Sequence, residues 1–214
     1  VLTDSVFSAD GDLAPLHALH RVCRAHGALL LVDEAHGVGV RGVGGRGLVH
    51  EVGLAGEPDV VVTATLSKSL AAQGGIVLGD GRIREHLIDT ARTFIFDTGL
   101  APAAVGAARS ALRILREQPE RATAVLERAA DLARISGVDA PESAVVSVIL
   151  GDPMVAVGAA AACRERGLHV GCFRPPSVPA GTSRLRLTAR ANLDAEDLEL
   201  IESVLGDVLA EARV

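Results

Sequence analysis

The feature that most constrains the fold of this chain is a pair of short, continuous apolar runs, each closely followed by polar residues. The first run spans residues 28–32 (ALLLV), and the second spans residues 59–65 (DVVVTAT). Runs of this length without polar alternation are typical of strands buried on both faces of a parallel sheet. Ligands of open α/β sheets bind at the carboxyl ends of such strands, so the residues after these runs are the first functional candidates.

The polar residues at these strand ends suit the chemistry of pyridoxal 5'-phosphate (PLP). Asp33 follows the first run directly, and His36 comes three residues later; the second run ends at Thr65, with Lys68 just beyond. A lysine can form a Schiff base with PLP, and a carboxylate such as Asp33 keeps the pyridine nitrogen protonated, so that the ring accepts an electron pair. His36 could hydrogen-bond the 3'-oxygen of the ring, and the Thr65 hydroxyl could reach the phosphate from one helical turn before Lys68.

Other interpretations of the same residues stay open. The string GVGVRG at residues 37–42 matches a dinucleotide-binding fingerprint, but that fingerprint should open a helix, and residues 37–47 are too rich in glycine for one. The string DEAH at residues 33–36 also matches a helicase-type box, but that box needs a phosphate-binding GxxxxGK[ST] loop, which this sequence lacks. Taken singly, Lys68 could be a solvated surface lysine, Asp33 a helix cap and His36 a core histidine.

Ser8 and three arginines are further candidates for a site. Ser8 lies in residues 5–12 (SVFSADGD), so it is either a turn residue or a second donor to the coenzyme oxygen. Arg184 and Arg186 are two residues apart on a predicted strand and therefore share one face. Either of them, or Arg174, could bind a substrate carboxylate through two hydrogen bonds, or could merely belong to a solvated charged face.

Hydrophobic periodicity predicts alternating strands and helices, and hence an α/β fold. The predicted strands are residues 5–8, 28–32, 59–65, 75–78, 93–96, 145–150, 168–173 and 184–188. The predicted helices are residues 13–23, 83–91, two helices within 102–135 separated at Gln118-Pro119, then 155–166 and 195–212, the last capped by Asp194.

Composition excludes several classes of protein. The net charge is −6 and the arginines are scattered along the chain, which argues against a nucleic-acid-binding surface. No apolar run approaches the ~20 residues that span a bilayer, so we expect no membrane segment. The three cysteines form no C-x-x-C pair, so we expect neither a disulfide framework nor a metal site, and a reducing cytoplasm fits best.

Four segments of the sequence, taken in order, resemble the α-oxoamine synthases, which are fold-type-I PLP enzymes. They are residues 7–12, 32–39, 65–68 and 174–186, and the resemblance covers essentially the whole chain. It implies the carboxyl-terminal part of the fold-type-I large domain, with a mostly parallel sheet, followed by a small C-terminal α/β domain. The domain bounds implied are residues 1–104 for the partial PLP-binding domain, 105–135 for connecting helices and 136–214 for the small domain.

The resemblance implies a PLP-dependent acyltransferase activity. It is greatest to the family members that condense L-alanine with a pimeloyl thioester and release carbon dioxide, giving 8-amino-7-oxononanoate for biotin synthesis. The acyl donor would be pimeloyl-CoA or a pimeloyl carrier protein. Glycine-using members such as 2-amino-3-oxobutyrate coenzyme A ligase remain an alternative, as does a non-catalytic fragment that dimerises with a complete partner.

The resemblance also implies roles for individual coenzyme ligands. Lys68 holds PLP as a Schiff base, and Asp33 faces the pyridine nitrogen. Ser8 and His36 face the ring oxygen, whereas Thr65 contacts the phosphate. Lys68, His36 and Asp33 are therefore the predicted catalytic residues.

The substrate and the partner subunit are expected to meet other segments of the chain. Arg186 looks like the ligand of the amino-acid carboxylate, and Ser177 and Arg174 lie in the segment that forms the substrate loop of the family. Thr98 lies in a segment similar to one that approaches the partner subunit's site in the family's homodimer. Family members carry roughly as much chain again before the residue equivalent to Val1, so we expect a missing N-terminal segment, weak coenzyme binding and little turnover by this chain alone.

Overall fold

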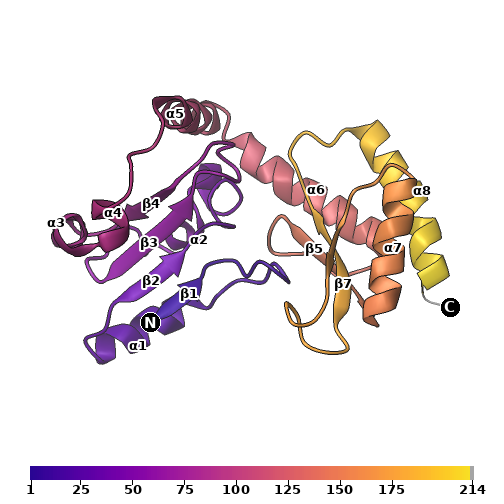
Figure 1. Cartoon of the computed structure of the whole chain (residues 1–214), viewed down its shortest axis with the longest axis horizontal. Helices are drawn as coiled ribbons and strands as arrows, with labels where there is room; N and C mark the ends of the chain where they lie inside the picture. Colours follow the sequence, from indigo (N-terminus) through magenta and orange to yellow (C-terminus); the bar gives the residue numbers. More distant parts are fainter. Residues whose placement is uncertain (213–214) are drawn as a thin grey trace. The chain divides into compact units, whose positions relative to one another are not determined.

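The computed structural model describes residues 1–212, which fold as two compact units (Figure 1). Unit 1 consists of Val1–Val6 and Leu13–Ala122. Unit 2 consists of Phe7–Asp12 together with the rest of the chain from Thr123. The predicted α/β class is confirmed, because each unit combines a β-sheet with helices.

Unit 1 is built around a four-stranded sheet with the order β1-β2-β3-β4. Its strands are β1 (Leu2–Asp4), β2 (Leu30–Asp33), β3 (Val60–Thr65) and β4 (Gly75–Leu78). The first three strands are parallel, and β4 is antiparallel to β3. Its helices are α1 (Leu16–Ala25), the 3-10 turn η1 (Val43–Gly45), α2 (Leu48–Glu51), α3 (Gly81–Thr90), α4 (Arg92–Ile95) and α5 (Pro102–Glu117).

The core of unit 1 is formed where the apolar stripe of α1 packs on the parallel strands. Leu16 and Cys23 of α1 pack with Leu30 and Val32 of β2, and all four side chains are at most 1% exposed. The strand residues alternate between this core and the opposite face, as the two-residue period of a strand requires. The core therefore fixes the register of β2 and with it the position of Asp33 at the carboxyl edge of the sheet.

Unit 2 contains a three-stranded antiparallel sheet with the order β5-β7-β6. Its elements are α6 (Glu120–Ser136), β5 (Val145–Gly151), α7 (Pro153–Glu165), β6 (Gly171–Phe173), β7 (Ser183–Thr188) and α8 (Ala195–Ala212); α6 begins in the last residues of unit 1. Leu185 and Leu187 of β7 point into a core shared with the three helices. Arg184 and Arg186 lie on the opposite face of the same strand, as the two-residue spacing predicts.

Most predicted elements are confirmed, but two strands are wrong. The predicted strand at residues 93–96 is the helix α4, in which the amides of Phe94 and Ile95 bond to the carbonyl of Ala91. Its aromatic and β-branched side chains favour strands only when a neighbouring strand offers a surface to pack on, and Phe94 is 64% exposed.

The predicted strand at residues 5–8 is also misplaced. The first strand is Leu2–Asp4, which pairs with Leu31–Asp33 and ends there, and Val6 forms only an isolated bridge with Leu13. The amide of Phe7 bonds instead to the carbonyl of Asp12 at 2.9 Å, so the turn-forming residues between them close a loop where a longer strand was expected.

No helix within residues 1–212 combines the length and the apolar character needed to cross a membrane. The three cysteines are free thiols. Cys23 and Cys163 are buried, and Cys172 is partly exposed.

Candidate functional site

The carboxyl edge of the unit 1 sheet places three polar residues side by side. Asp4, Asp33 and Thr63 are paired in register across β1, β2 and β3. The Asp33 carboxylate accepts hydrogen bonds from the Ala35 amide at 2.7 Å and from the Thr63 hydroxyl at 2.9 Å, one on each oxygen. Each carboxylate oxygen has a second lone pair, so Asp33 is held in place and can still accept a hydrogen bond from a ligand.

Asp4 is a member of this edge that sequence analysis missed. Burial raises the pKa of its carboxyl, the neighbouring Asp33 raises the pKa further, and the positive charge of Lys68 opposes both effects. The three charges therefore interact at one end of the sheet. Asp4 would have been found by placing the first strand at residues 2–4, where it ends on an aspartate as β2 does.

Glu34, next to Asp33, is buried beneath this edge and ties three segments together. Its side chain is 1% exposed and accepts hydrogen bonds from the Ser5 hydroxyl at 2.7 Å and from the Val49 amide at 2.6 Å. A Cβ atom on Gly37 would lie 1.8 Å from the Glu34 carboxylate, and one on Gly47 would lie 2.7 Å from it. The glycines of the predicted loop therefore make room for a buried carboxylate.

Lys68 extends from the turn that follows β3. It is exposed, and it is flanked at a distance of two residues by the buried Leu66 and Leu70. The Thr65 hydroxyl lies 2.7 Å from the hydroxyl of Ser67 and accepts a hydrogen bond from the Ser67 amide at 3.2 Å. Thr65 and Lys68 are therefore separated by a bend, and not by the helical turn expected from the sequence.

The two loops that carry these residues touch each other. The Ser69 hydroxyl donates to the Val38 carbonyl at 2.7 Å, and a Cβ on Gly39 would lie only 2.4 Å from the Ser69 side chain. The turn after β2, which contains His36, is closed by bonds from the Gly37 and Val38 amides to the Glu34 carbonyl. Four predicted residues, Asp33, His36, Thr65 and Lys68, are thus brought to one edge of unit 1.

The donor set at this edge fits PLP. A fixed carboxylate can face a pyridinium nitrogen, an imidazole can face a ring oxygen, and hydroxyl groups can meet a phosphate. Lys68 is moreover the only lysine in the sequence, a signal that sequence analysis overlooked. No other side chain of the chain carries an amine that could bind the coenzyme covalently.

Thr98 is not brought to this edge by any contact within residues 1–212. It is exposed in the segment between α4 and α5, where its amide bonds to the Asp97 carboxylate at 2.8 Å. Its role toward a partner subunit stays a prediction.

Unit 2 brings Ser8 and Arg186 together. Nε of Arg186 donates to the Ser8 carbonyl at 2.7 Å, and Nη1 donates to the Thr188 hydroxyl at 3.0 Å. The guanidinium also lies 5.5 Å from the centre of the Phe173 ring. Burial lowers the pKa of Arg186, although the group stays charged at neutral pH.

Arg184 is enclosed, in contrast to Arg186. Its side chain is 4% exposed and forms an ion pair with Asp10, and it donates to the Ser147 hydroxyl at 3.2 Å and to the Thr182 carbonyl at 2.9 Å. Burial lowers its pKa as well. Of the two arginines left open by the sequence on this strand, Arg186 is therefore the one available to a ligand.

Arg174 and Ser177 lie in the exposed loop between β6 and β7. The Ser177 amide bonds to the Arg174 carbonyl at 3.0 Å, and the following residue, Val178, is 5% exposed. The loop is thus anchored by one apolar side chain and leaves both predicted substrate residues open to solvent.

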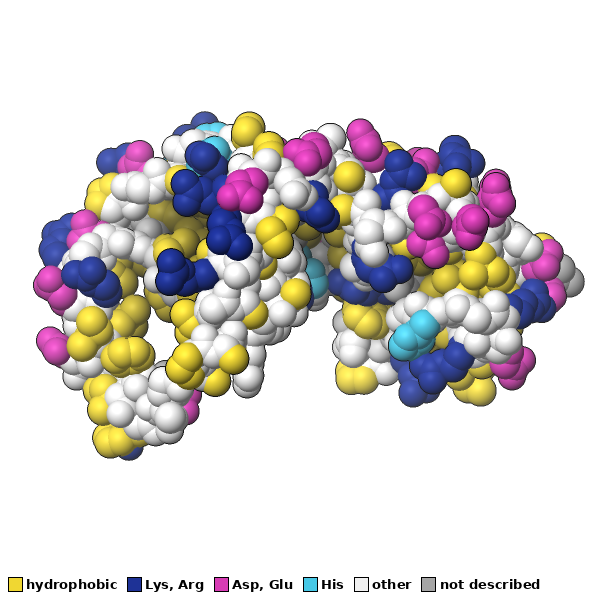
Figure 2. Space-filling view, turned by 90° about the horizontal axis from the view of Figure 1, so that it is seen from above, with side chains coloured by type: hydrophobic (Ala, Val, Ile, Leu, Met, Phe, Trp, Pro, Cys, Tyr) yellow, Lys and Arg dark blue, Asp and Glu magenta, His cyan; other side chains and the backbone are white. Residues whose placement is uncertain are grey.

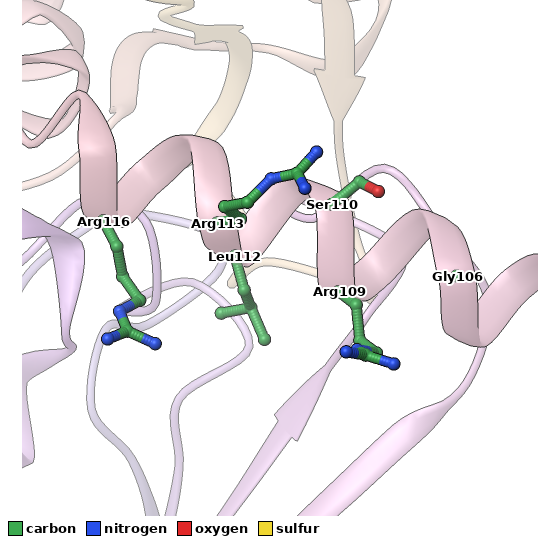
Figure 3. Close-up of a pocket in the computed structure, with 6 residues that line it drawn as sticks. All are labelled: Gly106, Arg109, Ser110, Leu112, Arg113 and Arg116. Atoms are coloured by element: carbon green, nitrogen blue, oxygen red, sulfur yellow. The ribbon is translucent and has the colours of Figure 1, made fainter.

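Two surface hollows are present, one in each unit, and one of them is lined by a predicted site residue. One, of about 570 Å³, runs along α5 in unit 1, where Figure 3 shows Arg109, Leu112 and Arg116 pointing to one side of the helix. None of the predicted site residues lines it. The other, of about 500 Å³, lies in unit 2 between the segment before β6 and the start of α8, and Arg186 contributes to its wall.

One group of metal-ligating side chains occurs within the described residues. His20, Glu57 and Asp59 place one potential ligand atom each within 4.8 Å of one another. His20 is already paired with Asp59 at 3.0 Å, and Arg24 lies 3.5 Å from Glu57 and 3.6 Å from Asp59. These ion pairs account for the group without a metal.

Known proteins are similar to this chain over its whole length. The family model of aminotransferase class I and II matches residues 1–204. The chain is 72% identical to a Mycolicibacterium smegmatis protein named 8-amino-7-oxononanoate synthase and 70% identical to a Mycobacterium bovis protein of the same name. Both matches cover 100% of this chain, but only 56% and 55% of the relatives, so the chain spans about half of their length.

Solved structures of similar proteins agree with this match. A serine palmitoyltransferase from Sphingomonas wittichii superposes with a TM-score of 0.92 at 33% identity, covering 99% of this chain and 55% of that protein. A serine palmitoyltransferase variant from S. paucimobilis, solved with a bound PLP–myriocin aldimine, gives 0.90 at 31% identity, covering 99% and 55%. An 8-amino-7-oxononanoate synthase from Francisella tularensis shares the fold at 23% identity, with a TM-score of 0.82 and coverage of 100% and 63%.

Proposed function

Because the chain belongs to the aminotransferase class I and II family, we propose that it is part of a PLP enzyme of the α-oxoamine synthase group. The proposed reaction joins L-alanine to a pimeloyl thioester, releases carbon dioxide and the free carrier, and gives 8-amino-7-oxononanoate for biotin synthesis. The observation that carries the choice of substrates is the 72% identity, over all 214 residues, to the M. smegmatis relative of that name.

The site residues supply the parts that this reaction needs. PLP, when bound, accepts the electron pair released at the substrate α-carbon. Asp33 would face the ring nitrogen, His36 and the hydroxyl of Ser8 would donate to the ring oxygen, and Thr65 would donate to the phosphate. Lys68 would hold the coenzyme through its amine, and the same amine would serve as the base for the proton of the substrate α-carbon.

Arg186 is proposed as the ligand of the alanine carboxylate. Its guanidinium has N–H donors on a planar fork that matches a carboxylate, and Arg184 on the same face is enclosed. Ser177 and Arg174, on the exposed loop before β7, are proposed to contact substrate. The proposed acyl donor is pimeloyl-CoA or a pimeloyl carrier protein. We also propose a homodimer in the cytoplasm, with Thr98 facing the partner subunit; the free cysteines support a reducing compartment.

The coenzyme assignment is tested by trapping PLP on the chain. The 214-residue chain is mixed with PLP, reduced with borohydride, digested, and analysed by mass spectrometry. We expect the pyridoxyl group on Lys68, because the only other amine is that of Val1. The variant Lys68→Ala should lose this product, and a label confined to Val1 would refute the assignment.

The reaction is tested with the chain joined to the part of the M. smegmatis relative that lies beyond the match. Turnover of L-alanine with pimeloyl-CoA is compared with turnover of glycine with acetyl-CoA, and the product is identified by mass. We expect the first pair to react faster. Faster reaction of the second pair would instead assign the chain to a glycine-using relative.

A further inference from the structure

The segment Phe7–Asp12, here called the Ser8 loop, belongs to unit 2, although the residues on both sides of it belong to unit 1. It closes on itself through two backbone hydrogen bonds. The Phe7 amide donates to the Asp12 carbonyl at 2.9 Å, and the Gly11 amide donates to the Phe7 carbonyl at 2.8 Å. The loop is therefore compact in itself, and its position depends on its contacts with other residues of unit 2.

Two arginines of β7 hold this loop from the same face of the sheet. Arg184 forms an ion pair with Asp10, and Arg186 donates to the Ser8 carbonyl at 2.7 Å. Both contacts join residues more than 170 positions apart in the sequence. The loop thus accepts two hydrogen bonds from arginines two positions apart on β7, one on the Asp10 carboxylate and one on the Ser8 carbonyl.

Arg184 depends on Asp10 for its counter-charge. The residue is 3% exposed, and its other partners, Ser147 and Thr182, are neutral. Asp10 is the only carboxylate within 4.0 Å of it among residues 1–212. A buried guanidinium without a counter-charge is costly, so this pair is a strong constraint on the place of Asp10.

The Ser8 carbonyl in turn determines which edge of Arg186 is open. A guanidinium can bind a carboxylate through the edge formed by Nε and one Nη, or through the edge formed by its two Nη atoms. Within residues 1–212, Nε donates to the Ser8 carbonyl, and Nη1 donates only to the exposed Thr188 hydroxyl. The end-on edge, formed by Nη1 and Nη2, is left for a ligand.

We infer that Arg184 is a positioning residue: through Asp10 it fixes the Ser8 loop, and through the Ser8 carbonyl it fixes the edge that Arg186 presents to a carboxylate ligand. The loop-fixing part stands on the contacts within unit 2 alone. The consequence for the amino-acid substrate rests on the proposed function.

Asp10 is the residue at which this inference can be tested without unfolding unit 2. Its side chain is 53% exposed. The loop keeps a second anchor, because Gly11, at a φ of +81°, packs so closely that a Cβ would lie 2.6 Å from the Ser143 hydroxyl. Replacement of Asp10 should therefore loosen the loop while the sheet stays folded.

The first experiment measures amide hydrogen exchange in the full 214-residue chain. In Asp10→Ala we expect the amides of Phe7 and Gly11 to exchange about tenfold faster or more, since one charge-assisted hydrogen bond is lost. Asp10→Asn keeps an oxygen acceptor for Arg184 but removes the counter-charge, so its exchange rates should lie between those of wild type and Asp10→Ala. The matched control is Asp12→Ala, an exposed carboxylate of the same loop, which should leave both amides unchanged. Equal exchange in Asp10→Ala and wild type, or equal acceleration in Asp12→Ala, would overturn the inference.

The second experiment measures steady-state kinetics of the same variants in the chain completed with the M. smegmatis segment. We expect Asp10→Ala to raise the KM for L-alanine about tenfold and to leave the KM for the thioester unchanged, with the KM of Asp10→Asn for L-alanine between those of wild type and Asp10→Ala. Faster exchange with an unchanged KM for L-alanine would show a loop anchor only and would overturn the positioning role. If the completed wild type shows no turnover, the proposed function fails, and the exchange experiment still decides the loop-fixing part.

Discussion

Glu34 is the residue on which the geometry of the unit 1 edge depends most directly. We expect Glu34→Ala to lower the free energy of unfolding by about 3 kcal/mol, because the Ser5 hydroxyl and the Val49 amide lose their acceptor inside the protein and a cavity remains. Glu34→Gln keeps an oxygen for Val49 and a polar group for Ser5, so its loss should be about 1 kcal/mol. Urea denaturation of both variants measures the difference, and equal losses would contradict the hydrogen-bonding role.

Asp4 gives the edge a pH dependence. Its pKa is raised above 3.8 in the folded chain, so the folded state binds more protons than the unfolded state in the pH range just above 3.8. The free energy of unfolding therefore falls as the pH rises through that range, and the penalty is complete at neutral pH. We expect Asp4→Asn to be more stable than the wild type at pH 7.

The free energies of unfolding of wild type and Asp4→Asn should converge below pH 3.8, where Asp4 is protonated in both the folded and the unfolded state. Denaturation curves of wild type and Asp4→Asn at several pH values make the comparison. Asp89→Asn, at an exposed carboxyl on α3, is the control for the general effect of removing a charge. An advantage of Asp4→Asn that persists unchanged in acid would contradict the argument.

Sequence reasoning at the scale of residues found the groups whose chemistry is specific and missed those whose role is geometric. Asp33 and Lys68 could be singled out because a carboxylate and an amine at strand ends suggest a reaction. Glu34 stands beside Asp33 in the same motif, but only the structure shows that it is buried and bonded to Ser5 and Val49. The partner of Arg184 lies at Asp10, 174 positions away, and no local pattern indicates such a contact.

At the scale of elements, the α-helix α7 shows how local signals specify structure. Asp152 precedes Pro153, and its carboxylate accepts hydrogen bonds from the Met154 amide at 2.7 Å and the Val155 amide at 3.1 Å. We expect Asp152→Ala to cost about 1 kcal/mol of stability, since two amides of the first turn lose their cap. Asp152→Asn should cost less, and Asp139→Ala, another exposed aspartate of unit 2, serves as the control in the same urea titrations. A loss in the control as large as in Asp152→Ala would argue against capping.

The sequence could predict those elements that have both a regular spacing of hydrophobic residues and a capping or turn residue at an end. Residues 195–212 and 75–78 coincide with α8 and β4, and the predicted cap of α8 is present, with the Asp194 carboxylate accepting from the Asp197 amide at 2.9 Å. The helix α4 was predicted as a strand because its residues have a high strand propensity, and that propensity depends on packing against neighbouring strands. None of its residues is buried, so this packing is absent and the propensity did not decide the structure.

At the scale of the whole molecule, exposed apolar side chains are concentrated in one region of unit 1, here called the α3–α5 surface. Neither α3 nor α4 buries any residue, and α5 buries only Ala108. The residues of this surface are Val77, Leu78, Ile88, Phe94, Ile95, Phe96, Leu100, Val105, Leu112 and Ile114, each at least 41% exposed. Figure 2 shows hydrophobic side chains open to solvent in the part of the molecule at the left, where Figure 1 labels α3 and α4.

Exposed apolar regions of this kind mark surfaces that interact with protein, membrane or ligand. The curated relatives are longer than this chain, which covers 56% of the first of them, and a homodimer is proposed above. Either source supplies additional protein that could cover the α3–α5 surface. The isolated chain can cover it by association with further copies.

We therefore expect the isolated 214-residue chain to self-associate in a concentration-dependent manner. The double variant Phe94→Ser with Phe96→Ser should weaken this association about tenfold or more, because the two rings, 64% and 78% exposed, would no longer leave water on association. Met154→Ser, at a 72% exposed apolar residue of unit 2, is the matched control and should associate as the wild type does. Sedimentation velocity over a range of concentrations measures all three proteins. A wild type that stays monomeric throughout would contradict the predicted self-association, and a control weakened as much as the double variant would show that association does not depend on the α3–α5 surface.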